Sequence, residues 1–137
     1  MIRRSADVFF YGLFMDQELL RAKGLHPGQV ELAWVEGLAL RIGQRAALVS
    51  RPGARVYGLV VSLTLEELEK LYSEPSLLAY QPQAVLAHLS GGGSIGALCY
   101  NLADPPTFAE PNPAYVAELR AVAERAGLPA EYVASIQ

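Results

Sequence analysis

The segment 11–14 contains residues whose types and order could bind an anion through the backbone. Aromatic and β-branched residues over 8–15 predict a short buried strand that runs into Gly12, and a helix-like segment, 16–24, follows at once. Glycine lets a ligand approach the main chain, and N–H groups at a helix start carry partial positive charge. The segment is therefore a candidate anion-binding turn, although such turns also occur in many folds that bind nothing.

Glu74 is the candidate for proton transfer. It lies in a predicted loop directly after a helix, between Ser73 and Pro75, in a stretch with few other charges. Partial desolvation there would raise the pKa of the carboxyl and make Glu74 a usable base, and then acid, near neutral pH. The alternative is a surface glutamate in a turn, since most glutamates are exposed.

Tyrosines are numerous for a chain of this length. Several are expected in the core with the hydroxyl on a hydrogen-bond partner. Clustered around a cleft, they could instead hydrogen-bond a small polar ligand. They are Tyr11, Tyr57, Tyr72, Tyr80, Tyr100, Tyr115 and Tyr132.

Other reactive side chains give little support for a site. His26 and His88 are the only histidines and neither has a ligand at metal-binding spacing, so no metal site is predicted. Cys99 lies in a predicted strand and is expected to fill the core. As the only cysteine it excludes an intrachain disulfide and fits a reducing cytoplasm. A hydrolase or acyl transferase that uses Cys99 is an alternative that requires an exposed thiol with a base nearby.

Strands dominate the elements that must position these residues. The clearest strand, 55–63, contains Gly58, which indicates a bulge or a close backbone approach. A strand over 29–42 is expected to be broken or bulged near Gly37. The remaining predicted strands are 46–49, closed by a turn at 51–53, and a hairpin of 83–89 and 95–102.

Helical segments flank these strands. Thr64 and Glu67 form a capping box for a helix over 65–72, after which an irregular loop covers 73–80. Asn112 is the predicted N-cap of a second helix, which starts with Pro113 and stops at Gly127. A short helical turn follows over 129–136. These elements predict one α+β domain, 1–137, with a mixed, barrel-like sheet and a few flanking helices.

The composition limits the classes of partner. Hydrophobic residues make up 52% and charged residues 18% of the chain, which indicates a packed globule. The net charge of −3, without a basic stripe, argues against nucleic acid. Arg3 and Arg4 precede an apolar run, but Asp7 interrupts it and no cleavage pattern follows, so no signal peptide is predicted. No apolar run approaches the roughly 18 residues of a membrane span, so we expect a cytoplasmic protein.

The order of these features resembles the gamma-glutamylcyclotransferase-like family. Its members have a strand that ends in Tyr-Gly, a Val-x-Gly strand, a helix, a loop with a catalytic glutamate and a later tyrosine. The matching residues here are Tyr11-Gly12-Leu13-Phe14, Val56-Tyr57-Gly58, Glu74 and Tyr80. Segments 111–115 and 126–132 look like the family's Pro-x-Pro-x-Tyr and Gly-Leu-Pro-x-Glu-Tyr segments, so the resemblance spans nearly the whole chain.

The resemblance implies a compact β-barrel-like fold and a reaction that needs no metal or organic cofactor. The α-amine of a γ-glutamyl group attacks its own γ-carbonyl, which forms 5-oxoproline and releases an amine, amino acid or peptide. Glu74 would be the general base and acid. Backbone N–H groups of Gly12, Leu13 and Phe14 would hold the α-carboxylate or the developing oxyanion. The residues that would line or orient the pocket are Tyr11, Tyr80, Tyr100 and Tyr115.

Two departures from the family pattern bear on the substrate. Many members have Ser, Thr or Asn after Tyr-Gly, where this chain has Leu13 and Phe14 and so offers only backbone donors. The glutamate loop reads Glu-Pro where Glu-Gly is common, and Pro75 stiffens it and removes an N–H. These changes leave open a non-catalytic binding module of the same fold. A Glu74 carboxylate that points into a cleft beside the turn favours the enzyme, and one that faces solvent favours the module.

The expected ligand is a small γ-glutamyl compound, with neither nucleic acid nor membrane as a partner. A proline-rich apolar segment, 105–111, could form a homodimer contact or could simply cover the barrel.

Overall fold

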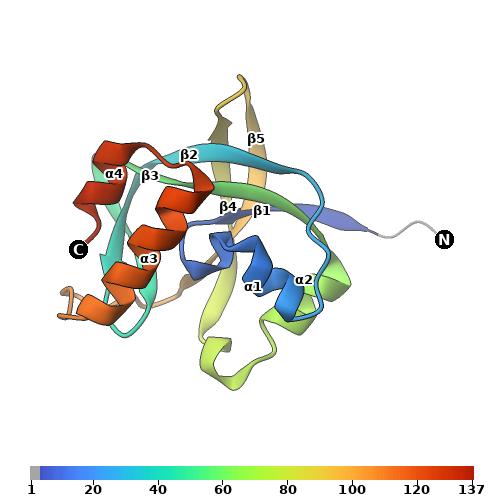
Figure 1. Cartoon of the computed structure of the whole chain (residues 1–137), viewed down its shortest axis with the longest axis horizontal. Coiled ribbons are helices and arrows are strands. Elements are labelled where there is room, and N and C mark those ends of the chain that lie inside the picture. The colour runs from blue at the N-terminus through green and yellow to red at the C-terminus, as the bar shows by residue number, and fades with distance from the viewer. Residues whose placement is uncertain (1–3) are drawn as a thin grey trace.

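Five strands form a closed barrel in the order β1-β3-β2-β4-β5 (Figure 1). The computed structural model describes residues 4–137, so Arg3 of the predicted N-terminal pattern lies outside the described residues. The α+β, barrel-like fold expected from the sequence is confirmed. The strands are β1 (Ser5–Phe10), β2 (Val30–Ile42), β3 (Ala46–Thr64), β4 (Tyr80–Leu89) and β5 (Ser94–Leu102).

Strand β1 is shorter at its C-terminal end than the predicted strand over 8–15. It pairs antiparallel with β3 from Ser5↔Thr64 to Phe10↔Leu59, and it meets β5 in parallel at Val8↔Leu98, which closes the barrel. After Phe10 the chain leaves the sheet and forms the 3₁₀ turn η1 (Leu13–Met15) before helix α1 (Gln17–Ala22). The apolar side chains of η1 therefore continue the hydrophobic run of β1 without continuing its strand.

The predicted turn at 51–53 is wrong, because β3 continues through it as one long strand. Both halves of β3 pair with β2, as Glu36↔Arg55 and Leu38↔Ser50 show. The register shifts between Glu36 and Leu38, which confirms the irregularity predicted at Gly37. Gly53 has a φ of 83°, where glycine is favoured, so the residues that resembled a turn form an excursion within the strand.

Gly58 lies at a close approach between two strands, as the sequence predicted. A Cβ built on it would stand 2.1 Å from the carbonyl oxygen of Phe10 and 3.0 Å from the Phe9 ring. No real side chain fits at such distances, and the obstacle is backbone that cannot swing away. Gly58 therefore sets how closely β3 can pack against the end of β1.

The hairpin β4–β5 is antiparallel, as predicted, and pairs from Tyr80↔Leu102 to His88↔Ser94 (Figure 1). On β5 the buried amide of Asn101 donates to the Leu48 carbonyl at 3.0 Å and accepts from the Leu48 N–H at 2.9 Å. This side chain thus supplies to β3 the pair of hydrogen bonds that a neighbouring strand would supply.

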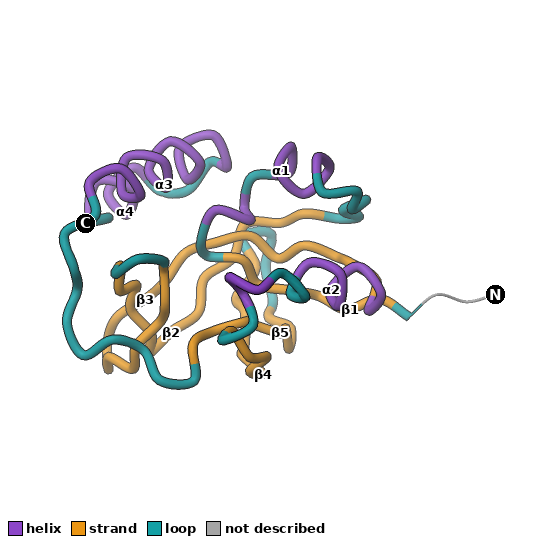
Figure 2. Tube along the Cα trace, turned by 90° about the horizontal axis from the view of Figure 1, so that it is seen from below, coloured by secondary structure: helices purple, strands orange, loops and turns teal. Residues whose placement is uncertain are grey.

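Helices lie outside the barrel, and α1, α3 and α4 share one side of the strands (Figure 2). The capping box predicted at Thr64 and Glu67 is present at the start of α2. The Asn112 side chain caps α3 by accepting from the Tyr115 N–H, and Gly127 ends α3 with a φ of 86°. The helices beyond the barrel are α2 (Leu65–Leu71), η2 (Pro75–Leu77), α3 (Pro113–Ala126) and α4 (Ala130–Ser135).

Alternating side chains of β1 divide the core in two. Val8 and Phe10 pack with the buried faces of the helices, including Leu20 of α1 and Leu119 of α3. Phe9 and the next odd position, Tyr11, pack inside the barrel with strand residues. Because β1 contributes to both clusters, its C-terminal end is held from two sides, and the turn that follows it starts from a fixed point.

The proline-rich segment, 105–111, lies across the hairpin of β2 and β3. The Arg41 guanidinium donates to the Pro106 carbonyl at 2.8 Å, and the Glu110 N–H donates to the Ile42 carbonyl at 3.0 Å. Phe108 is 79% exposed. The segment therefore covers one end of the hairpin, and a homodimer contact through this segment stays a prediction. Among helices within residues 4–137, none is long and apolar enough to span a membrane.

Candidate active site

A cavity of about 350 Å³ opens beside the end of β1, between the barrel and helices α1 and α3. All eight residues singled out from the sequence line this cavity, although they are spread over much of the chain. They are Tyr11, Gly12, Leu13, Phe14, Glu74, Tyr80, Tyr100 and Tyr115. The fold therefore brings the candidate turn, the candidate carboxylate and the other candidate tyrosines to one place.

The turn 11–14 forms one wall of the cavity. Gly12 has an extended backbone, with φ −114° and ψ −150°, which other residues also adopt. A Cβ there would lie 3.6 Å from the Tyr115 hydroxyl and 3.8 Å from the Ala46 Cβ, so glycine keeps this part of the wall open. Leu13 and Phe14 are the first residues of η1, and N–H groups at such positions have no partner within their own turn. The wall can therefore present backbone donors to the cavity, and a binding role for these donors stays a prediction.

Tyr11 is held by the barrel itself. Its hydroxyl donates to the Tyr100 carbonyl at 2.9 Å and also lies 3.5 Å from the Asn101 amide oxygen. Burial raises the pKa of Tyr11 well above its ordinary value, and the nearby Cys99 thiol raises this pKa further. Tyr11 therefore stays a neutral phenol that fixes the start of the turn against β5.

Two further phenols converge near the backbone of Ala46, the first residue of β3. The Tyr80 hydroxyl donates to the Ala46 carbonyl at 2.6 Å. Burial raises the pKa of Tyr80 to about 12, and burial also raises the pKa of Tyr115. Both groups are therefore uncharged hydrogen-bonding groups across the physiological range, suited to a polar ligand rather than to proton transfer.

An aromatic wall completes the apolar part of the cavity. Tyr72 and Tyr100 stack with ring centroids 3.8 Å apart and an interplanar angle of 9°. Phe14 meets Tyr72 edge to face, with centroids 6.0 Å apart, and it meets Phe10 in the same way at 5.9 Å. Tyr72 is one of the numerous tyrosines of the sequence, but it was not among the four that the resemblance implied for the pocket. It belongs to this wall because it caps the C-terminus of α2 and faces the turn.

Glu74 reaches the cavity from the segment after α2. It is the N-cap of η2, so the loop predicted over 73–80 contains one short 3₁₀ turn that buries Leu77. Its carboxylate is bound by the Lys23 ammonium, with 43% of the Glu74 side chain and 28% of the Lys23 side chain exposed. Glu74 is thus half-exposed rather than desolvated as expected, and it lines the cavity beside the turn.

Three charged residues of the cavity were not predicted. Lys23 caps the C-terminus of α1, Arg45 immediately precedes β3, and Glu118 lies on α3. A lysine at a helix C-terminus is common for reasons of the helix dipole alone, so its sequence position carried no functional signal. Lys23 and Glu74 are 51 positions apart, and only the folded chain shows that they pair.

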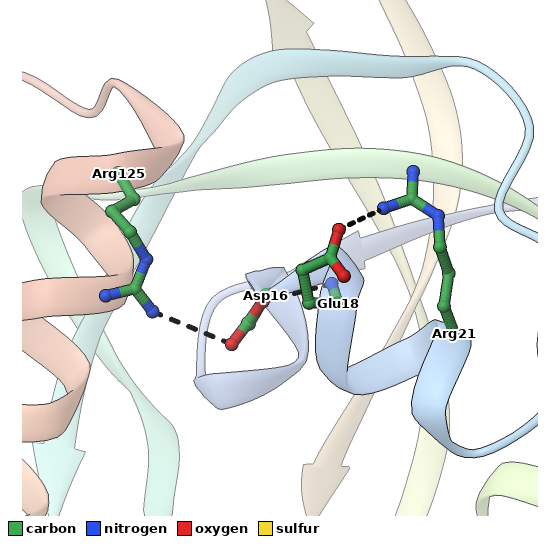
Figure 3. A network of polar contacts seen from close by, with 4 residues as sticks. All are labelled: Asp16, Glu18, Arg21 and Arg125. Carbon is green, nitrogen blue, oxygen red and sulfur yellow. Dashed lines mark hydrogen bonds and ion pairs between the residues drawn. The ribbon is translucent and has the colours of Figure 1, made fainter.

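Ion pairs fix the helix that carries Lys23 (Figure 3). The Asp16 side chain caps α1 by accepting from the Glu18 N–H at 3.1 Å, and Asp16 also pairs with Arg125 of α3 at 3.6 Å. Glu18 pairs with Arg21 one turn along, at 2.8 Å. The N-cap of α1 is thus tied to α3, so the two helices that flank the cavity are linked on its outer side.

The alternatives built on other reactive groups gain no support from the structure. Cys99 is fully buried, and burial raises the pKa of its thiol to about 12. His88 stacks on Trp34, with ring centroids 5.5 Å apart, and neither of these two residues lines the cavity. Within residues 4–137, no three His, Cys, Asp or Glu side chains are grouped so that they could hold a metal ion.

Comparisons with known proteins agree with this architecture. The family model described as gamma-glutamyl cyclotransferase, AIG2-like, matches residues 8–119. A solved gamma-glutamyl cyclotransferase superposes with a TM-score of 0.78 at 22% identity, over 98% of this chain and 89% of that one. An uncharacterized human protein superposes with a TM-score of 0.80, also at 22% identity and with the same coverage.

YkqA from Bacillus subtilis superposes with a TM-score of 0.74 at 21% identity, over 95% of this chain and 52% of YkqA. At these identities the structural likeness shows a shared fold. A comparison with curated proteins found no significant match.

Proposed function

Because this chain belongs to the gamma-glutamyl cyclotransferase, AIG2-like family, we propose that it is a γ-glutamyl cyclotransferase. In this reaction the α-amine of a γ-glutamyl compound attacks its own γ-carbonyl carbon. A new C–N bond closes the five-membered ring of 5-oxoproline, and the original γ-amide C–N bond breaks. The attacking nitrogen loses two protons as the α-ammonium becomes the lactam N–H, and the nitrogen of the leaving amine, amino acid or peptide gains two protons as it becomes an ammonium, so the exchange balances.

One observation carries the proposal: the Glu74 carboxylate lines the same cavity as the turn 11–14. Glu74 takes a proton from the substrate's α-ammonium, which frees the nucleophile, and returns it to the leaving amine. The backbone N–H groups of Gly12, Leu13 and Phe14 stabilise the oxyanion that forms on the γ-carbonyl oxygen. The cavity of about 350 Å³ is at the small end of ligand sites, which suits a γ-glutamyl group folded for attack on itself.

The tyrosines orient the substrate in this proposal. Tyr11 and Tyr100 hold the turn through their hydrogen bond, while Tyr80 and Tyr115 present hydroxyls near the Ala46 backbone. None of these phenols is needed as an acid or base, because Glu74 alone can carry the proton from one nitrogen to the other. No metal or organic cofactor is needed for this chemistry. The proposed location is the cytoplasm, which the single cysteine favours.

Release of 5-oxoproline from a panel of γ-glutamyl amines, γ-glutamyl amino acids and glutathione tests the proposal. Glu74→Gln is assayed in parallel, because glutamine keeps the shape of the side chain and loses the proton acceptor. Glu66→Gln, an exposed glutamate of α2 outside the cavity, is the matched control. We expect turnover by the wild type and by the control, and loss of turnover in Glu74→Gln. Equal turnover by all three proteins would contradict the role of Glu74.

A non-catalytic binding module is the second candidate, and the Lys23–Glu74 ion pair favours it. A carboxylate that is already bound by an ammonium is well placed to recognise a ligand's charges. The module predicts that γ-glutamyl compounds bind and that none of them releases 5-oxoproline. The same panel separates the two functions when binding is measured beside product release.

A further inference from the structure

Lys23 and Glu74 place one positive and one negative charge in direct contact at the cavity. The two side chains come from different elements, since Lys23 caps α1 and Glu74 precedes η2. Both are partly exposed, so each can exchange its partner for a ligand group. No other ion pair within residues 4–137 joins two residues that line this cavity.

The α-carbon of a γ-glutamyl compound carries the complementary pair of charges. Its ammonium and its carboxylate are bonded to the same carbon, so both must be bound within a few ångströms of one another. We propose, on the basis of the proposed function, that Lys23 binds the substrate's α-carboxylate while Glu74 receives the α-ammonium. The substrate thus replaces the Lys23–Glu74 ion pair with two new ion pairs and leaves no charge unpaired.

The backbone of Lys23 is held by hydrogen bonds within α1, and its side chain is held by Glu74 alone among the ion pairs of residues 4–137. The Lys23 N–H donates to the carbonyls of Leu19 and Leu20 at 3.2 and 3.1 Å, and the other end of α1 is tied to α3 by Asp16. The ammonium sits on a flexible four-carbon stem with rotatable donors. A change of partner by Lys23 therefore requires side-chain rotation and no movement of the helix.

Arg45 is the competing cation in the cavity, and its position makes it the weaker choice. It adjoins Ala46, whose carbonyl accepts the Tyr80 hydroxyl, so it belongs to the wall formed by β3 and β4. Lys23 instead contacts the carboxylate that must receive the α-ammonium. When Glu74 binds the α-ammonium, the α-carboxylate on the same carbon is within reach of Lys23.

The turn 11–14 could bind either the α-carboxylate or the oxyanion, and this assignment selects the oxyanion. With Leu13 and Phe14 in place of hydroxyl or amide side chains, the turn has only backbone donors. If Lys23 holds the α-carboxylate, these N–H groups remain available for the oxyanion on the γ-carbonyl. The substrate class is then a γ-glutamyl compound with both a free α-ammonium and a free α-carboxylate, and an α-carboxamide is a poor substrate.

The test compares γ-glutamyl-L-alanine with the same compound carrying an α-carboxamide on its glutamyl residue. Lys23→Met removes the charge and keeps a stem of similar length, Lys23→Arg keeps the charge, and Lys70→Met is a matched control outside the cavity. We expect the wild type and Lys70→Met to prefer the carboxylate by about tenfold to a hundredfold in kcat/KM, the range for losing one charged hydrogen bond. Lys23→Met should lose that preference through a raised KM for the carboxylate, and Lys23→Arg should restore part of it.

An equal fall of kcat/KM for both substrates in Lys23→Met would overturn the inference, because Lys23 would then act only by positioning Glu74. An unchanged preference in Lys23→Met would overturn it as well. Either result leaves the cyclotransferase proposal intact, since turnover itself would still be observed.

Binding separates failure of the inference from failure of the proposed function. L-Norleucine has the same charged α-carbon but no γ-carbonyl, and NMR titration measures its binding against that of L-norleucinamide. A wild-type preference for L-norleucine that disappears in Lys23→Met supports the inference even if no compound is turned over. Equal binding of the two compounds by the wild type, or binding of neither, overturns it.

Discussion

Glu67 and Glu74 lie at the two ends of helix α2 and are held in opposite ways. Glu67 closes the capping box at the start of the helix and accepts from the backbone N–H groups of Thr64 and His26, at 2.9 and 2.6 Å. Glu74, just past the other end, is bound by one flexible side chain, that of Lys23. The main chain cannot leave Glu67 without local unfolding, whereas Lys23 can leave Glu74 by rotating.

The difference distinguishes a structural glutamate at one end of α2 from the candidate catalytic glutamate beyond the other end. Backbone donors bind both carboxylate oxygens of Glu67, so it joins α2 to the segment around His26. An exchangeable partner leaves Glu74 available in the cavity. Changes at the two glutamates should therefore separate into effects on stability and effects on turnover.

The largest expected effect is on turnover by Glu74 variants. Glu74→Gln should lower kcat by about 10²- to 10⁴-fold, the usual contribution of a general base. Glu74→Asp keeps the charge but withdraws it from the cavity, and should lower kcat by about 10²-fold through misplacement. Urea unfolding should show a change within about 1 kcal/mol for both, because a half-exposed ion pair adds little stability. A large loss of stability with little loss of turnover would mean that Glu74, like Glu67, has a structural role.

A change at Glu67 should produce the opposite result. Glu67→Ala removes the acceptor for two backbone N–H groups and should lower the free energy of unfolding by about 1–2 kcal/mol. The kcat of the folded protein should stay the same. Glu66→Ala is the matched control, since Glu66 lies in the same first turn of α2 but takes no part in the capping box. Equal destabilisation by the two variants would mean that only the charge near the helix start matters.

The pH dependence of stability sharpens the role of Glu67. Desolvation raises its pKa, but hydrogen bonds from the His26 and Thr64 backbone and from the Thr64 hydroxyl outweigh it and hold this pKa below the ordinary value. A lowered pKa in the folded state adds stability that is present above the unfolded value of about 4.3 and is lost as pH falls through the folded value. The stability gap between wild type and Glu67→Ala should therefore narrow with acid. A gap that is constant from pH 7 to pH 3 would disprove this linkage.

The smallest expected effect concerns Cys99, the alternative catalytic residue. Cys99 is fully buried and the pKa of its thiol is raised to about 12, so a thiol reagent should leave native protein unmodified at pH 8. Turnover should be the same before and after treatment, with the urea-unfolded protein as the positive control for labelling. Rapid labelling of native protein with loss of turnover would move the chemistry from Glu74 to Cys99.

Local signals in the sequence predicted the features that depend on neighbouring residues. The capping box of Thr64 and Glu67, the cap at Asn112 and the stop at Gly127 were all recovered, because each involves groups within a few positions. The prediction of a turn at 51–53 was wrong because the outcome depends on pairing with another strand and not on neighbouring residues. Pairing with β2 keeps both halves of β3 in one strand despite a proline and a glycine.

The candidate site also contains some residues that the sequence predicted and others that only the fold shows. The resemblance assembled the turn and Glu74 from motifs along the chain, and the cavity brings them together. Lys23, Arg45 and Glu118 were missed, because a charged residue at a helix end or in a turn looks like ordinary surface until the fold is known. The partner of Glu74 could not be predicted, since the Lys23 contact depends on how α1 packs beside α2.

The cavity wall has a thermodynamic consequence, because strands β1, β3, β4 and β5 and helices α1 and α3 all contribute to it. A compound bound there needs all of these elements folded at once, so the unfolded chain has no affinity to compete with binding. Its binding energy is then added to the stability of the whole barrel, about 2.7 kcal/mol when the compound is present at 100 times its Kd. Melting temperature becomes a direct measure of occupancy, and a library of γ-glutamyl compounds can be ordered by affinity before any product is assayed.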